Sequence, residues 1–130
     1  ETFSEYIDQL PDRYLACYSP EEIARHIEMA RSMERELLLV EWEIEKKIHA
    51  KVTVYTKDRY GLFSKITGSM FLNRLNVLKA QIHTWENGLA LDTFWVEDVT
   101  EDIERRLQQF EKDLKEILLK KGFQNTKYQL

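Results

Sequence analysis

The residues whose types and spacing suit chemistry lie in one short loop, KDRYGLF at residues 57–63. A strand-like run, KVTVYT, ends just before this loop, and an amphipathic segment begins directly after Gly61. Backbone N–H groups at the start of a helix lack intrahelical partners, so those of Gly61 and Leu62 suit a ligand carboxylate. The Asp58 carboxylate suits a ligand ammonium group. The loop therefore has the two features needed to bind a small amino acid.

The same loop also has a purely structural interpretation. Asp58 can cap the helix through its carboxylate. Gly61 can relax a tight turn, because glycine adopts a positive φ without strain. Leu62 and Phe63 can then fill the core. Composition alone leaves both interpretations open.

The rest of the sequence lacks metal-binding and catalytic patterns. The three histidines are far apart: His26, His49 and His83. Neither they nor the single Cys17 have the spacing of zinc ligands, and no phosphate-binding loop or nucleophile elbow occurs. Two acidic pairs, Glu21–Glu22 and Glu101–Asp102, stand at expected helix starts, where the helix dipole explains them. We therefore expect no catalytic residue, metal or cofactor in this chain.

Composition favours one globular domain in a reducing compartment. The 130 residues are 43% hydrophobic and carry 19 basic and 23 acidic side chains, for a net charge of −4. The absence of a basic tract argues against a nucleic-acid partner. No apolar run reaches the roughly 18 residues of a membrane span, and one cysteine fits the cytoplasm. The chain begins with Glu and no signal-peptide pattern follows, so we expect a cytoplasmic segment of a longer protein.

Hydrophobic periodicity predicts the order of the elements. Helices are expected over residues 3–9, 20–34, 61–73 and 100–122, and strands over 37–45, 48–56, 76–85 and 89–97, with a further short strand within 123–130. Ser19 and Thr100 are expected N-caps, and Asn87-Gly88 favours a type I′ turn with positive φ at both residues. From residue 37 the order is strand, strand, helix, strand, strand, helix. This order predicts an α+β, ferredoxin-like fold: a split βαβ, antiparallel sheet with both helices on one face.

The two faces of the predicted sheet differ in character. One face is apolar, with Leu78, Ala80, Ile82, Ala90, Phe94 and Val96. The first helix beside it is expected to bury Phe63, Ile66, Thr67 and Met70. Asp92 interrupts the apolar face, and the sequence shows no partner for it. The other face is mixed, and its exposed aromatic residues, Trp85 and Trp95, predict a surface for a partner sheet or domain.

Residues 52–96 resemble the ACT-domain family of small-molecule-sensing modules. The matching segments are DRYGLF at 58–63, NRLNV at 73–77, AQIHT at 80–84 and NGLALDTF at 87–94. More narrowly, they resemble the ACT region of the uridylyltransferase/uridylyl-removing enzymes. LPDRYLACYSPEEIARHI, at residues 10–27, is similar to the segment that joins the HD domain of those enzymes to their first ACT module.

This chain departs from the family pattern in three ways. Tyr60 stands where the family has proline in the loop. One ACT unit is present, where the family enzymes have two in tandem. A strand over 37–45 precedes the usual first strand, and we hypothesise that it takes the sheet position of the usual last strand.

The resemblance implies a regulatory amino-acid-sensing module with glutamine as its ligand. The parent enzyme would control nitrogen signalling by transferring a uridylyl group from UTP, with Mg, to the PII protein and by removing it. Those catalytic motifs lie outside these residues. The implied division is a helical linker from the end of the HD region at 1–35 and an ACT domain at 36–130. The implied ligand-binding residues are Asp58, Arg59, Gly61, Leu62, Phe63, Asn76 and Ala80, with the last two supplied by a second ACT module or a second copy.

There are two alternatives to amino-acid sensing. A ligand-free ACT-type dimerisation or docking module would use the sheet face that carries Trp85 and Trp95. A ferredoxin-like RNA-binding domain would need aromatic RNP motifs and a basic surface, and the sequence has neither.

Overall fold

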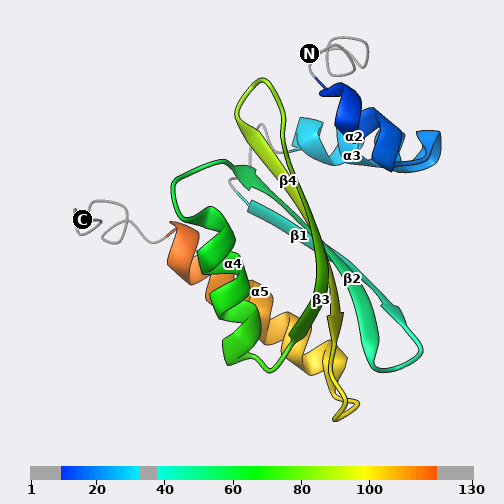
Figure 1. The fold of residues 1–130 in the computed structure, drawn as a ribbon. Coiled ribbons are helices and arrows are strands. Elements are labelled where there is room, and N and C mark those ends of the chain that lie inside the picture. Colours follow the sequence, from blue (N-terminus) through cyan, green and yellow to red (C-terminus); the bar gives the residue numbers. More distant parts are fainter. Residues whose placement is uncertain (1–9, 33–37, 120–130) are drawn as a thin grey trace.

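Four antiparallel strands form the central sheet of the structure, a computed structural model that describes residues 10–32 and 38–119 (Figure 1). They are β1 (Leu38–Glu45), β2 (His49–Lys57), β3 (Asn76–Thr84) and β4 (Leu89–Glu97). Their order across the sheet is β1-β2-β4-β3, and each neighbouring pair is antiparallel. β2 and β3 are therefore parallel, with β4 between them. This is an α+β, ACT/ferredoxin-like fold, as the element order predicted.

The early strand β1 lies at the sheet edge beside β2, where the hypothesis had placed it. When the split βαβ unit is counted from β2, this edge is the position that the last strand of the standard module would take. A tight turn sets the β1–β2 register, in which Leu38 pairs with Thr56. The turn residues Lys46 and Lys47 have φ values of 52° and 68°, the left-handed geometry that matches the twist of paired strands.

Helices α4 (Leu62–Leu72) and α5 (Ile103–Leu119) cover one face of the sheet (Figure 1). The α5 stripe is fully buried: Ile103, Leu107, Phe110, Leu114 and Leu118. The start of α5 differs from the prediction, because Thr100 does not cap it. The Thr100 backbone N–H and hydroxyl both donate to Asp98 Oδ1, at 2.9 and 2.6 Å. Thr100 therefore belongs to a turn before the helix, and α5 begins three residues later.

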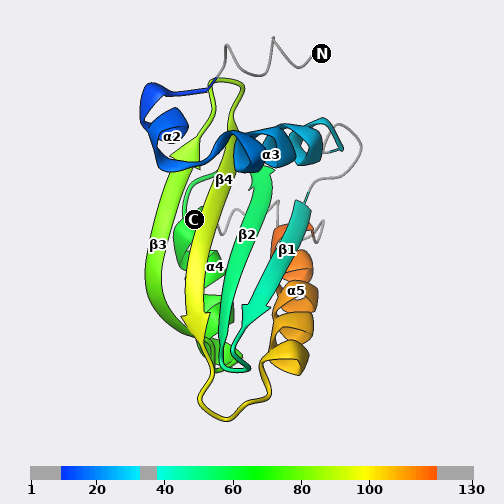
Figure 2. The same ribbon diagram turned by 90° about the vertical axis from the view of Figure 1, so that its right-hand side faces the viewer.

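Helices α2 (Asp12–Cys17) and α3 (Pro20–Ser32) cross one end of the opposite sheet face (Figure 2). Ser19 caps α3 as predicted: its Oγ accepts from the Glu22 N–H, and Glu22 Oε1 accepts from the Ser19 N–H, both at 3.1 Å. A second core forms beneath them, from Leu10, Tyr14, Tyr18, Ile27, Ala30, Tyr55, Trp85 and Leu91. The prediction that Trp85 is exposed is therefore wrong, because this side chain is only 1% exposed.

Two details of the β3–β4 hairpin also differ from the prediction. Gly88 has a φ of +85°, but Asn87 is not in the positive-φ region. The Gly88 N–H donates to Trp85 O at 2.9 Å, which is the three-residue hairpin loop with a glycine bulge rather than a type I′ turn. A register shift between Val77 and Lys79 turns Leu78 outward, so Leu78 is 53% exposed instead of lying in the apolar face.

Several expectations fall outside the described residues. They are the helix over 3–9, the end of the 20–34 helix beyond residue 32, the helix end at 120–122 and the strand within 123–130. Among the described residues, no helix is both long enough and apolar enough to cross a bilayer.

Candidate functional site

The predicted binding loop is a tight turn between β2 and α4. The Asp58 N–H donates to Gly88 O at 2.8 Å, which anchors the loop to the β3–β4 hairpin. Gly61 has a φ of +75°, and a Cβ atom there would lie 3.3 Å from Lys65 Nζ. Glycine is therefore required by the backbone geometry, and this part of the structural interpretation is confirmed.

The backbone N–H groups of the loop are only partly available. The Leu62 N–H, which the sequence assigned to a ligand carboxylate, donates to Arg59 O at 3.1 Å within the turn. Among the described residues, the N–H groups of Gly61 and Phe63 make no backbone hydrogen bond. The N-cap of α4 is Gly61, and no side chain caps this helix. Asp58 is therefore not a helix cap, and that part of the structural interpretation is wrong.

Aromatic side chains do not fill the loop. Tyr60 is 99% exposed and Phe63 is 47% exposed, although Phe63 was predicted in the core. The phase of α4 explains the difference: the helix begins at Leu62, so the inward positions fall on Leu62, Ile66, Ser69 and Met70. Phe63 is one position further round the helix, and its ring lies 6.1 Å from that of Phe94.

Arg59 connects the loop to the far helix. Its Nη1 donates to the Leu118 carbonyl at 3.0 Å, near the C-terminal end of α5. A cation suits that position, because the last carbonyls of a helix carry partial negative charge. The guanidinium thus has a structural contact within the domain in addition to the ligand role that the sequence assigned to it.

Asp92 is a candidate site residue whose role the sequence did not explain. It lies in β4 between Val54 of β2 and Ile82 of β3, and it is 1% exposed. Within the described residues, its Oδ1 has no hydrogen-bond partner. Burial and, to a smaller extent, the nearby charge of Asp58 together raise the pKa of the Asp92 carboxyl to about 7. An ammonium group beside both carboxylates would relieve this unfavourable pairing.

Asn76 and Ala80 are not at the loop of the same chain. Both lie on the edge strand β3, where Asn76 pairs with Glu97 at one end of the sheet. Asp58 follows the opposite end, because Lys57 pairs with Leu89. The sequence assigned Asn76 and Ala80 to a second module, and one copy alone does not bring them to Asp58.

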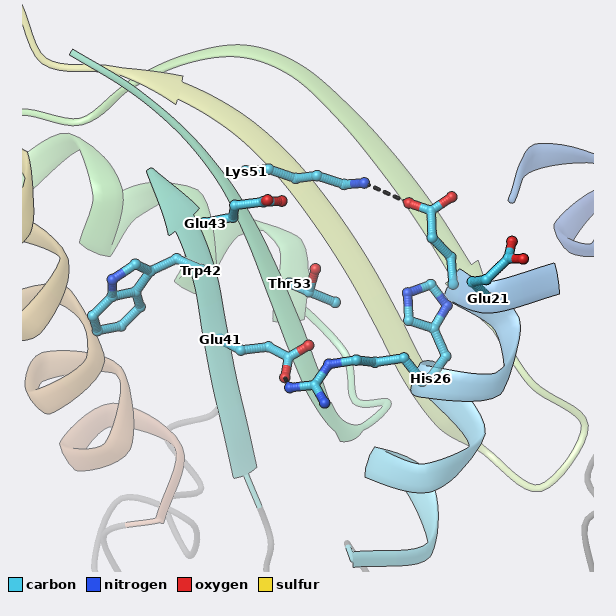
Figure 3. Close-up of a pocket in the computed structure, with 9 residues that line it drawn as sticks. Glu21, His26, Glu41, Trp42, Glu43, Lys51 and Thr53 are labelled. Carbon is cyan, nitrogen blue, oxygen red and sulfur yellow. Dashed lines mark hydrogen bonds and ion pairs between the residues drawn. The ribbon is translucent and has the colours of Figure 1, made fainter. Parts of the chain in front are cut away.

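A cavity of about 400 Å³ lies elsewhere, between α3 and the strands β1 and β2 (Figure 3). It contains none of the seven residues that the sequence assigned to ligand binding. The one sequence signal for it was the helix start at Glu21–Glu22, which was explained by the helix dipole.

This chain is similar in sequence to several known enzymes. No protein-family model matches it. It is 32% identical over 119 residues, 87% of its length, to a bifunctional uridylyltransferase/uridylyl-removing enzyme of Rhodospirillum rubrum. The enzyme of the same name from Nitrosospira multiformis is 30% identical over 95% of the chain. The one from Gluconobacter oxydans is 35% identical over 57% of the chain. The chain spans only 13%, 14% and 8% of the length of these three relatives.

Proposed function

We infer the function of this chain from one premise: it is homologous to a region of the bifunctional uridylyltransferase/uridylyl-removing enzymes. We propose that it is the regulatory amino-acid-sensing module of such an enzyme, with glutamine as its ligand. Residues 1–35 would link it to an HD domain, and residues 36–130 would form the ACT module. The enzyme as a whole would work in the cytoplasm, using UTP and Mg, on the PII protein.

The observation that carries this proposal is the charge arrangement around the β2–α4 loop. Asp58 and the buried Asp92 are close enough for the charge of one to raise the pKa of the other. The N–H groups at the start of α4 are nearby, and among the described residues those of Gly61 and Phe63 have no backbone acceptor. Two carboxylates beside free N–H groups complement the ammonium and carboxylate of an amino acid.

The proposed mechanism is linkage between ligand binding and module arrangement. A ligand at the loop of one module would also contact Asn76 and Ala80 on β3 of a second module. It would then favour the arrangement of modules in which both contacts form. The shift is limited by the difference in ligand affinity between the two arrangements.

The Asp58→Ala variant tests the ligand assignment. We expect glutamine to raise the melting temperature of the unmodified chain and not that of this variant, because the ammonium group loses its exposed counter-charge. Thermal unfolding with increasing glutamine measures the shift. Asp12→Ala, which removes an exposed carboxylate from α2, should keep the full shift. An equal shift in Asp58→Ala would disprove the role of Asp58.

A ligand-free docking module is the second candidate, and one exposed surface favours it. We define the β3–α4 edge by its exposed apolar side chains: Phe71, Leu72, Leu78 and Ile82, which are 79%, 76%, 53% and 37% exposed. β3 is also an edge strand, so its outer backbone groups can pair with another strand. On the sheet face that the sequence favoured for docking, α2 and α3 cover the end with Trp85, whereas Trp95 stays partly exposed.

The Leu78→Lys variant tests this second candidate. If the β3–α4 edge pairs two copies, a charge at its centre should raise the dimer dissociation constant by about tenfold or more. Sedimentation equilibrium measures this constant. Leu15→Lys, at an exposed position on α2, is the matched control and should leave it unchanged. A monomeric chain at all concentrations, or no effect of Leu78→Lys, would contradict pairing at this edge.

A further inference from the structure

The loop of the β3–β4 hairpin contains the one Asn-Gly pair of the sequence, Asn87-Gly88, and its tip projects past the end of the sheet (Figure 1). Asn87 is exposed, and its Oδ1 accepts a hydrogen bond from the Leu89 N–H at 3.1 Å. This bond is an Asx turn, in which the side-chain carbonyl folds back over the peptide that follows. The Cγ carbon of Asn87 is therefore held beside the Gly88 nitrogen, an atom that can attack it.

Asn87 is more open to this attack than the other asparagines that the structure describes. Gly88 has no side chain to hinder its nitrogen, and a Cβ atom there would have no heavy atom within 4 Å. Asn73 is 9% exposed, and its side-chain amide donates two hydrogen bonds, at 2.8 and 3.0 Å. Asn76 is exposed, but the β-branched side chain of Val77 crowds the nitrogen that would attack it.

One hydrogen bond slows the reaction in the folded chain. The Gly88 N–H donates to Trp85 O at 2.9 Å, and this bond must break before the nitrogen attacks. Exposed loop tips open locally at a small cost in free energy, so the rest of the fold stays intact while this happens. The reaction therefore proceeds in the folded chain, but more slowly than in the unfolded one.

We propose that Asn87 is a site of spontaneous deamidation. The Gly88 nitrogen forms a bond to Cγ of Asn87 and gives up its proton, while the bond from Cγ to Nδ2 breaks and ammonia leaves. Water then opens the resulting succinimide ring at either of its carbonyl carbons, which yields aspartate or isoaspartate. This site goes beyond the proposed amino-acid sensing, because the reaction needs only water and no ligand.

The modification acts on the β2–α4 loop, because Gly88 anchors that loop. The Gly88 carbonyl accepts the Asp58 N–H at 2.8 Å. Isoaspartate routes the main chain through the former side-chain carbons of Asn87, which lengthens the chain by one carbon directly before Gly88. The Gly88 carbonyl is then displaced from the Asp58 N–H. Aspartate adds the same charge without lengthening the main chain, so it leaves the anchor in place.

Incubation of the full chain at pH 8 and 37 °C, followed by peptide mass mapping, tests the modification. We expect Asn87 to gain about 1 Da, at a rate about tenfold or more above that of Asn76. Urea should raise the rate at Asn87 by a further tenfold or so, because the hairpin is then open. Asn87→Gln should stay unmodified, since glutamine would need a larger ring. An Asn87 that stays intact in the folded chain while it reacts in urea overturns the proposal.

Amide hydrogen exchange tests the effect on the loop. In the isoaspartate form, purified from the incubated chain, the Asp58 N–H should exchange about tenfold faster than in the fresh chain. The Leu75 N–H, which donates to Met70 O at 2.9 Å beyond the other end of α4, is the control and should be unchanged. Asn87→Asp should exchange like the fresh chain. Equal exchange in the fresh and isoaspartate forms, or equally fast exchange in Asn87→Asp, overturns the proposed effect of main-chain lengthening.

Discussion

Replacing Trp85 with alanine should lower the free energy of unfolding by about 4 kcal/mol, the cost of removing a large buried aromatic side chain. Trp85 is 1% exposed and packs at the centre of the second core, with its ring 5.9 Å from that of Tyr14 on α2. The space left by the indole would lie between the sheet and the N-terminal helices. Urea unfolding followed by circular dichroism measures the change.

Trp95→Ala is the matched control for this prediction. Trp95 lies on the same sheet face but beyond the N-terminal helices, and Lys79 Nζ is 4.6 Å from the centre of its ring. We expect a loss of about 1 kcal/mol for this partly exposed side chain. Equal losses for the two tryptophans would show that α2 and α3 do not cover the sheet as described.

The Asp92→Asn variant should remove a pH dependence of stability. In the folded chain the pKa of Asp92 is raised from 3.8 to about 7. A raised carboxyl pKa means that the folded state holds the proton more tightly, so stability falls as pH rises from about 4 to about 7 and is then constant. The free energy of unfolding of the unmodified chain, relative to the variant, should therefore fall by about 3 kcal/mol between pH 5 and pH 8.

The comparison with the variant isolates Asp92 from other titrating groups. His26 also titrates, but its contribution is the same in both proteins and cancels. Asp58→Asn should reduce the slope only in part, because burial is the larger cause of the raised pKa and the Asp58 charge the smaller one. A slope that is identical in the unmodified chain and in Asp92→Asn would show that Asp92 is ionised without cost, in contact with a partner.

The order of helices and strands was predictable because it depends on local patterns. Alternation predicted a strand over 37–45, where β1 spans Leu38–Glu45, and steps of three and four predicted a helix over 100–122, within which α5 lies. The capping box at Ser19 was likewise readable from neighbouring residues. The position of β1 beside β2 followed from the hypothesis that this strand takes the place of the last strand in a split βαβ sheet.

The predictions that were wrong depend on the backbone conformation of a single residue or on one residue of strand register. Gly88 alone takes the left-handed conformation, so the hairpin has a bulge instead of a type I′ turn. A bulge after Val77 reverses the direction of Leu78. Thr100 donates to Asp98 rather than capping α5. None of these choices changes the hydrophobic pattern, so the pattern cannot distinguish between them.

By itself, the sequence determined the α+β class, the ferredoxin-like order and a loop in which glycine is required at residue 61. Periodicity and turn chemistry are properties of neighbouring residues, and these features need no more. Only the tertiary structure decided that α2 and α3 cover Trp85, that Asp92 is buried near Asp58, and that a cavity faces His26 and Thr53. Each of these depends on contacts between segments far apart in the chain, whose geometry is set by the packing of whole elements.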